Sequence, residues 1–348
     1  MGNRLFICMI SLVLVGALTA CGGNRSGGVS QASSSASGEA ESPAAPSEIP
    51  SELTKVAQVT NWYAEAEHGG QYAAMKMNYY KEAGLDMTLD PGGPQISGVQ
   101  LVASGKYQFA MASADQVLLA RQEGLPIVAV ASIFQKSPMV FFSHKGDSIA
   151  DPEDLNGRTI YLTPGIGYWE YIKKKFAPRD VKEIAYTGSM ATFMTDKGSA
   201  NQGFVTSEGY SLLSSGFEFE AVPISDLSGF NPYSMLLVTS EQYIAENPEI
   251  VKAFVEASKK GWDYYKDNYK EMNEYIRTFN EESPIEMFDY SAEASRDYIY
   301  GGDAAEHGVL YMSDERWSTL KDQMAEAGLI DTSLDVSKAY TTEFLPQN

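Results

Sequence analysis

Aromatic side chains stand next to glycines at one place where the chain could hold a small flat molecule. An alternating run ends in Asn61-Trp62-Tyr63, and His68-Gly69-Gly70 follows a few residues later. An indole that stacks on a flat ring contributes about 1 kcal/mol beyond the burial of its area. The alternative is an ordinary strand-to-helix turn with Trp62 and Tyr63 in the core and His68 at the start of the helix. We predict Trp62, Tyr63 and His68 as ligand contacts.

Two further stretches place small or polar residues where a strand turns into a helix. Pro91-Gly-Gly-Pro-Gln95 contains Gly93 and precedes the expected helix at residues 96–105. Ser113-Ala-Asp-Gln116 stands at the start of the expected helix at residues 114–124. Free N–H groups at such helix starts bind anionic or carbonyl groups, although no Walker lysine follows and the spacing of a phosphate loop is missing. A tight turn and a plain helix cap are the alternatives. We predict Gly93, Gln95, Ser113 and Asp115 as site residues.

The second half of the chain repeats this arrangement. Thr163-Pro-Gly-Ile-Gly167 leads directly into Tyr168 and Trp169, so two aromatic rings stand at another glycine-rich helix start. We predict that Tyr168 and Trp169 face Trp62 across a cleft. The chain has three His, and no second His lies near any of them in sequence. A metal site or a catalytic dyad is therefore not expected, and neither is a cofactor.

The pattern of elements predicts an α/β fold. Strand, helix and glycine follow one another three times, which is typical of a parallel sheet. A second, smaller α/β unit follows, and the chain becomes helical after Ser240. The expected strands are residues 55–61, 85–90, 107–113, 125–134, 158–165, 182–188, 201–207 and 233–240, and the main expected helices are 71–84, 96–105, 114–124, 168–176, 190–198, 240–276 and 314–330.

The first 50 residues read as export and attachment signals. Arg4 precedes an apolar run that is too short to span a bilayer, which is typical of a signal peptide at residues 1–20. Leu18-Thr19-Ala20-Cys21 resembles the lipobox of bacterial lipoproteins, which implies lipidation of Cys21; a plain signal peptide is the alternative. Residues 21–50 are rich in Gly, Ser, Ala and Pro, and we expect a flexible tether there.

Charge and length limit the function further. With 26 Lys and Arg against 46 Asp and Glu, the net charge is −20, so nucleic acid is not expected as a partner. The remaining length favours two lobes. We expect residues 51–140 plus 236–348 in one lobe and 141–235 in the other. Such a tethered pair has the layout of bacterial solute-binding proteins, whose ligand lies between the lobes and is enclosed by hinge closure.

Several stretches resemble one family. Residues 61–87, 101–132 and 231–262 are similar to the binding proteins of ABC importers for thiamine pyrimidine precursors, and more distantly to sulfonate, taurine and nitrate binders. The resemblance implies a two-lobed periplasmic-binding-protein fold of type II and a tryptophan of the cleft at Trp62. It also implies an aromatic residue and a glutamate four residues apart, here Phe204 and Glu208, with Val205-Thr206-Ser207 in place of the usual Trp-Asn. Phe204 as a core residue is the alternative.

The resemblance implies a function as well. A carboxylate at Glu208 can accept paired hydrogen bonds from an aminopyrimidine edge. Gln135 and Tyr233 lie near the two expected lobe crossings and are added as site residues. We expect a monomeric, non-enzymatic, lipid-anchored protein outside the cytoplasm that passes its ligand to an ABC permease. Riboflavin is the main alternative ligand and a sulfonate or nitrate a weaker one. A pyrimidine-precursor synthase is the enzyme alternative, but its Cys-rich motif is missing because no Cys follows Cys21.

Overall fold

The computed structural model of the chain describes residues 49–346. The predicted signal peptide, almost all of the predicted tether and Cys21 lie outside the described residues. No helix in the described part is both long enough and apolar enough to cross a bilayer.

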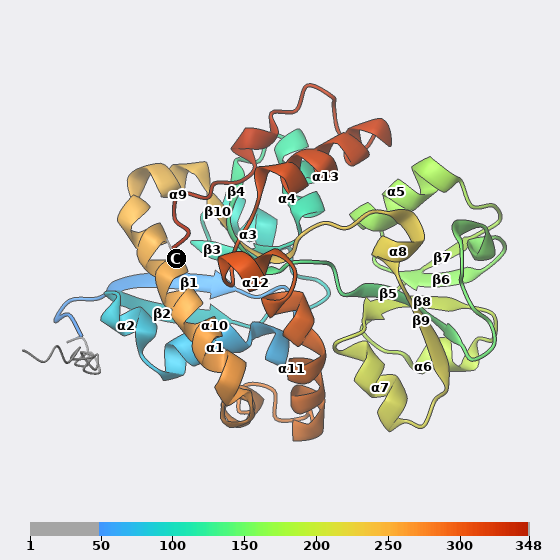
Figure 1. Ribbon diagram of the computed structural model, residues 1–348, viewed down its shortest axis with the longest axis horizontal. Coiled ribbons are helices and arrows are strands. Elements are labelled where there is room, and N and C mark those ends of the chain that lie inside the picture. Colours follow the sequence, from blue (N-terminus) through green and yellow to red (C-terminus); the bar gives the residue numbers. More distant parts are fainter. Residues whose placement is uncertain (1–48, 347–348) are drawn as a thin grey trace, which may run out of the picture. The chain divides into compact units, whose positions relative to one another are not determined.

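The first of two sheets contains five strands in the order β2-β1-β3-β10-β4 (Figure 1). β1 pairs in parallel with β2 and β3, whereas β10 runs antiparallel between β3 and β4. The expected all-parallel sheet is therefore wrong: a strand that returns from the second half of the chain is inserted into it. The strands are β1 (Thr54–Val59), β2 (Leu85–Asp90), β3 (Phe109–Ala112), β4 (Ile127–Phe134) and β10 (Ser234–Ser240).

The second sheet has the order β7-β6-β8-β5-β9. β6 pairs in parallel with β7 and β8, and β5 runs antiparallel to β8 and β9. We call the elements packed around the first sheet lobe 1 and those around the second sheet lobe 2. The chain passes from lobe 1 to lobe 2 between β4 and β5 and returns before β10. The strands are β5 (Met139–His144), β6 (Thr159–Leu162), β7 (Lys182–Ala185), β8 (Ala200–Phe204) and β9 (Phe219–Pro223).

The helices cover both sheets and place their N-termini near the strand ends. In lobe 1 they are η1 (Ala66–His68), α1 (Gly69–Lys76), α2 (Tyr79–Glu82), α3 (Gly98–Ala103), α4 (Ala114–Gln122), α9 (Glu241–Glu246), α10 (Pro248–Arg277), α11 (Ile285–Tyr300), α12 (Asp303–His307), α13 (Asp314–Glu326) and η3 (Val336–Lys338). In lobe 2 they are η2 (Pro152–Leu155), α5 (Gly167–Phe176), α6 (Ala191–Thr195), α7 (Glu208–Ser214) and α8 (Ile224–Ser228).

One expected helix is divided into two. The pattern of residues 71–84 predicts a continuous helix, but Asn78 adopts the left-handed conformation with φ of 62°, and α1 ends before it. Asn tolerates this conformation better than most residues because its short polar side chain bonds locally. α2 therefore begins in a new direction.

The two glycines after His68 serve helix packing. A Cβ on Gly70 would lie 2.3 Å from the indole of Trp262, and one on Gly69 would lie 2.3 Å from the ring of Tyr265. Both rings belong to α10, which lies along α1 (Figure 1). Any side chain at these positions would force the two helices apart. The close packing fixes α1, and with it the loop that precedes it.

Candidate functional site

A cavity of about 240 Å³ lies between the strand ends of the two lobes. Its walls combine aromatic rings, amides and carboxyl groups, which suits a small polar ligand better than a lipid. The lining includes Asn61, Trp62, Glu67, Ser113 and Asp115 of lobe 1 and Thr163, Tyr168, Tyr186, Gln202, Phe204 and Glu208 of lobe 2.

Trp62 stands at the end of β1 with its backbone fixed. Its carbonyl accepts hydrogen bonds from the Thr60 hydroxyl at 2.6 Å and from the N–H of Gly92 at 2.9 Å. The indole is half-buried, and its edge approaches Gly188 of lobe 2, where a Cβ would lie 3.6 Å from it. The ring therefore forms a wall of the cavity that reaches from one lobe to the other.

His68 lies behind this wall and supports it through a hydrogen bond to Asn61. The ring is fully buried; its Nδ1 accepts from the N–H of Glu65 at 3.4 Å, and its Nε2 is 3.1 Å from Asn61 Oδ1. An acceptor at Nδ1 leaves the proton on Nε2, so the neutral ring donates to Asn61. Burial lowers the pKa of His68 to about 3, which agrees with a neutral ring. This bond fixes the orientation of the Asn61 amide, whose Nδ2 donors and second Oδ1 acceptor position are available to the cavity that Asn61 lines.

Glu208 is held by three donors in lobe 2. Its Oε2 accepts from the N–H of Phe204 at 2.7 Å and from the Ser207 hydroxyl at 3.0 Å, and its Oε1 accepts from the Tyr186 hydroxyl at 3.1 Å. Burial raises the pKa of Glu208, while these donors lower it. Since each oxygen has two acceptor positions, Oε1 keeps one position for a ligand.

Glu67 lies opposite, on lobe 1, and is 2 % exposed. Its Oε1 accepts a hydrogen bond from the hydroxyl of Thr206, which belongs to lobe 2. Burial first, and then the charge of Glu208, raise the pKa of Glu67 to about 8. The pKa of neighbouring Glu65 is also well above its usual range, through burial and the charges of Glu67 and Glu208. Of these three carboxyl groups, Glu208 has the most hydrogen-bond donors, and these donors favour its ionised form.

The helix starts of the two lobes meet at Asp115. Its carboxylate lies so near α5 that a Cβ on Gly167 would be 2.1 Å from Oδ2. Burial raises the pKa of Asp115, and its Oδ1 has no hydrogen-bond partner within the described residues. Ser113 caps the same helix through a reciprocal pair of bonds with Gln116. A side chain at position 167 would therefore have to displace the Asp115 carboxylate.

Gln202 fixes the lobe 2 side of the cavity. Its Oε1 accepts from the Tyr168 hydroxyl at 2.8 Å and from the N–H of Thr163 at 2.8 Å, and its Nε2 donates to Thr163 Oγ1 at 2.9 Å. All three residues line the cavity. The network holds the Tyr168 ring in place rather than leaving it free to rotate.

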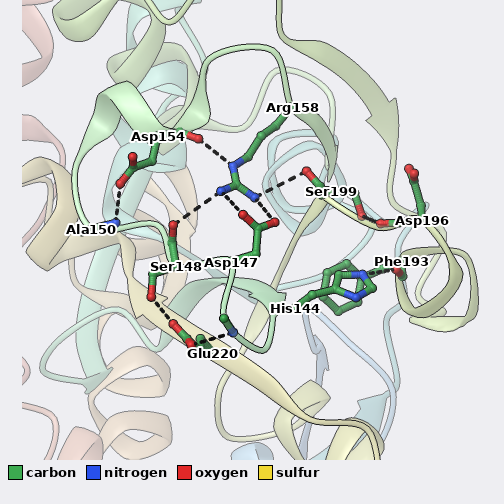
Figure 2. Close-up of polar contacts among 12 residues, drawn as sticks. His144, Asp147, Ser148, Ala150, Asp154, Arg158, Phe193, Asp196, Ser199 and Glu220 are labelled. Carbon is green, nitrogen blue, oxygen red and sulfur yellow. Dashed lines mark hydrogen bonds and ion pairs between the residues drawn. The ribbon is translucent and has the colours of Figure 1, made fainter.

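Another dense polar cluster lies in lobe 2 and lines no part of the cavity. Figure 2 shows the guanidinium of Arg158 bound to both oxygens of Asp147, at 2.7 and 2.8 Å. His144 bonds to the carbonyl of Phe193 at 2.9 Å in the same view. Within residues 49–346, no three His, Cys, Asp or Glu residues gather in a way that could hold a metal ion. The cluster ties loops to the second sheet.

Comparison with known proteins places the chain in a family. Residues 65–272 match the family described as NMT1/THI5 like. The chain belongs to the NMT1/THI5-like family. It is 26 % identical over 307 residues to the riboflavin-binding protein RibY of Chloroflexus aurantiacus, covering 84 % of this chain and 87 % of the relative.

Two other relatives carry different names. A formylaminopyrimidine-binding protein of Halalkalibacterium halodurans is 28 % identical over 260 residues, covering 70 % of this chain and 76 % of that protein. A 4-amino-5-hydroxymethyl-2-methylpyrimidine phosphate synthase of Saccharomyces cerevisiae is 26 % identical over 242 residues, covering 64 % and 70 %. The relatives of this chain therefore include proteins named as binding proteins and proteins named as synthases.

Solved structures confirm the predicted fold. A Candida albicans protein described as having the generic periplasmic binding protein structural fold superposes with a TM-score of 0.60 at 17 % identity, covering 85 % of this chain and 98 % of that one. The periplasmic aliphatic sulphonate binding protein SsuA of Escherichia coli gives a TM-score of 0.62 at 11 % identity, covering 84 % and 94 %. At these identities the likeness concerns the fold alone.

The NMT1/THI5-like chain brings seven of the thirteen predicted ligand-site residues to the cavity and places the other six elsewhere. Those that line it are Trp62, Gly93, Ser113, Asp115, Tyr168, Phe204 and Glu208. Tyr63 is 48 % exposed and packs its ring on Trp62 at 5.4 Å, and Gln95 is exposed beside the rim. His68 is a buried support for Asn61, as described above.

Three other predicted site residues belong to the protein core. Trp169 is fully buried against Phe141 because one helical residue turns the side chain about 100° away from Tyr168. The amide Nε2 of Gln135 bonds to the carbonyl of Tyr311 at 3.1 Å, in lobe 1. Tyr233 packs against Trp317 of α13, and its hydroxyl accepts from the N–H of Ser313 at 3.0 Å.

Among the cavity residues described above, the sequence predictions did not include Asn61, Glu67, Thr163, Tyr186 and Gln202. Three of them gave a signal in the sequence. Asn61 directly precedes Trp62, Tyr186 directly follows β7, and Gln202 lies in β8, whose end meets the edge where ligands bind in such sheets. Nothing local marks Glu67, whose place in the cavity depends on the opposite lobe.

Proposed function

We propose that this chain is an extracytoplasmic solute-binding protein that captures a small planar nitrogen heterocycle between its lobes and delivers it to an ABC permease. The observation that carries the proposal is the cavity itself. It combines the half-buried indole of Trp62 with the carboxylate of Glu208, which three donors hold in place. The ring supplies stacking and the carboxylate supplies directional hydrogen bonds.

A thiamine pyrimidine precursor is the ligand we favour. Its single ring suits a cavity of about 240 Å³, because sites for larger, drug-sized ligands occupy roughly 300–1,000 Å³. The formylaminopyrimidine-binding relative supports this choice. Riboflavin is the second candidate, since a relative that is 26 % identical over 307 residues is named a riboflavin-binding protein.

The charge of the cavity disfavours anions. Among the described residues, its lining includes Glu67, Asp115 and Glu208 but neither Lys nor Arg. A sulfonate or a phosphate ester brought among these carboxyl groups would lose its hydration without gaining a cationic partner. This argues against a sulfonate ligand and equally against the release of a phosphorylated pyrimidine.

We propose that the protein is not an enzyme, is monomeric, and is attached by a lipid on Cys21 to the outer face of the cytoplasmic membrane. The sequence supports the anchor through the Leu18-Thr19-Ala20-Cys21 motif, and it has no cysteine beyond Cys21 for the motif of the synthases. The relatives named as binding proteins support the transport role.

The test is a binding titration on the full chain purified in mild detergent. Isothermal titration calorimetry with 4-amino-5-hydroxymethyl-2-methylpyrimidine, with riboflavin and with an alkanesulfonate should give saturable binding for one of the first two only. Mass spectrometry of the ligand after prolonged incubation should return it unchanged. Binding of the sulfonate alone, or conversion of the heterocycle, would refute the proposal.

A further inference from the structure

Two carboxyl groups face the same cavity from opposite lobes, and their surroundings differ. Glu208 accepts from Tyr186, Phe204 and Ser207, an arrangement that stabilises a carboxylate. Glu67 has one such donor, the hydroxyl of Thr206, on Oε1. Its Oε2 has no hydrogen bond to any described residue, while the side chain is 2 % exposed and lines the cavity. A proton on that oxygen points its O–H to the ligand space.

We propose that Glu67 and Glu208 form an acid–carboxylate pair that selects a heterocycle edge bearing one acceptor next to one N–H donor. The protonated Glu67 donates from Oε2 to the acceptor, and Glu208 Oε1 accepts from the N–H. This inference rests on the proposed function and adds the specificity-determining role of Glu67.

Two kinds of heterocycle carry the required edge. In an aminopyrimidine it is a ring nitrogen beside the amino group, and in a flavin it is a carbonyl beside the imide N–H. An edge with only acceptors, such as a sulfonate, leaves the Glu208 carboxylate facing another negative group. The pair thus defines a hydrogen-bonding class, and the cavity size decides between its members.

The other groups around Glu67 favour its protonated state. Glu65 and His68 flank it in its own segment, and His68 is neutral. Glu208 and Tyr186 face it from lobe 2, and Asp115 lines the same cavity from α4. From the helices packed on η1, α10 presents Tyr265, and Asp289 of α11 is bonded to Asn273 at 2.9 Å. None of these groups is a cation, so nothing among them offsets a second negative charge beside Glu208.

Ligand affinity should fall as the pH rises through the pKa of Glu67. Burial and Glu208 hold the pKa of Glu67 at about 8, so the donor is present below that pH and is lost above it. Affinity should therefore be constant near pH 7 and fall as the pH rises to about 9, approaching tenfold for each unit above the pKa. A glutamine at position 67 keeps an N–H donor but does not titrate.

The experiment measures the dissociation constant at about pH 7 and about pH 9 for the wild type, Glu67→Gln and the matched control Glu123→Gln. Glu123 is exposed and outside the cavity. The probes are 4-amino-5-hydroxymethyl-2-methylpyrimidine and riboflavin, tested separately. We expect at least a fivefold loss of affinity at the higher pH in the wild type and in Glu123→Gln, and less than a twofold change in Glu67→Gln.

A second measurement uses the wild type alone, so it applies even if Glu67→Gln does not fold. Calorimetry of the wild type at about pH 8 in two buffers of different ionisation enthalpy gives the number of protons taken up, and we expect a net uptake of up to about half a proton. Equal pH profiles of affinity in the wild type and Glu67→Gln, or zero proton uptake by the wild type, would overturn the role of Glu67 but not the proposed function. Absence of binding of both probes at every pH would overturn the proposed function, and the pair with it.

Discussion

Trp62 provides the sharpest test of where the ligand lies. The four tryptophans of the chain are Trp62, Trp169, Trp262 and Trp317, and the last three are fully buried in the core. Trp62 alone among them lines the cavity, and it is half-buried. Removing its ring should therefore change ligand binding while leaving the free energy of unfolding nearly unchanged.

The expected loss of affinity can be estimated from this geometry. Stacking on an indole contributes about 0.5–1.5 kcal/mol beyond area burial. One ring face that covers a ligand removes on the order of 50 Å² of apolar area from water, which adds about 1 kcal/mol. Together these terms amount to about 2 kcal/mol, so Trp62→Ala should weaken binding by roughly 30-fold. Trp62→Phe should recover most of this loss because it keeps a stacking ring.

The same residue supplies the assay. Ligand binding should quench the part of the tryptophan fluorescence that comes from Trp62, and Trp62→Phe should bind with near wild-type affinity in calorimetry yet show no quenching. Trp169→Phe, a core substitution in lobe 2, is the control that should keep the quenching. Unchanged affinity in Trp62→Ala, or full quenching in Trp62→Phe, would show that the ligand lies elsewhere.

Three other substitutions test the supports of the site. Replacing His68 by Leu removes the donor to Asn61 and should weaken binding severalfold. The unfolded imidazole takes up a proton below about pH 6.5 and the folded one only near 3, so in urea unfolding the free energy of unfolding of the wild type relative to this variant should fall by about 1.4 kcal/mol per pH unit below 6.5. Gly167→Ala should displace the Asp115 carboxylate in the cavity wall, and we expect at least a tenfold loss of ligand affinity by calorimetry. Adding Asp115→Ala removes the clash and should restore part of the affinity. Arg316 at the start of α13 donates to the carbonyls of Gln135 and Asn231, in the two passages between the lobes. Arg316→Lys should lower the free energy of unfolding by about 1–2 kcal/mol, because one ammonium cannot replace both bonds of the guanidinium; an unchanged value would contradict this.

The sequence predicts the fold well because its signals are local. Alternation, helical periodicity and terminal glycines mark most elements within a few residues of their observed bounds, as for the strand at Thr54–Val59 and the helix at Gly167–Phe176. Strand direction is not a local property. The run at Ser234–Ser240 has the same pattern whether it pairs in parallel or antiparallel, so its insertion between β3 and β4 could not be predicted.

A cavity residue can be predicted from the sequence only where its position depends on the elements of a single lobe. Trp62 and Glu208 follow strands, and the ends of such strands meet at the cleft. Tyr168 and Trp169 looked equivalent because both follow a glycine-rich turn, and only helix geometry separates the cavity side from the core side. The two glycines after His68 looked like a ligand loop, but their small size is required by the rings of α10.

Contacts between the lobes lie at and beside the cavity, so the proposed recognition of a ligand would be linked to lobe closure. Glu67 of lobe 1 bonds to Thr206 of lobe 2, and the hydroxyl of Tyr290 in lobe 1 donates to the carbonyl of Val205 at 3.1 Å. A ligand shifts an open–closed equilibrium only by the difference between its affinities for the two states. A ligand that bonds both Glu67 and Glu208 would bind the closed state more tightly than the open one, because only the closed arrangement presents both carboxyl groups to one edge of the ligand. A molecule that reaches only Trp62 binds the open and closed lobes almost equally and leaves the equilibrium where it was.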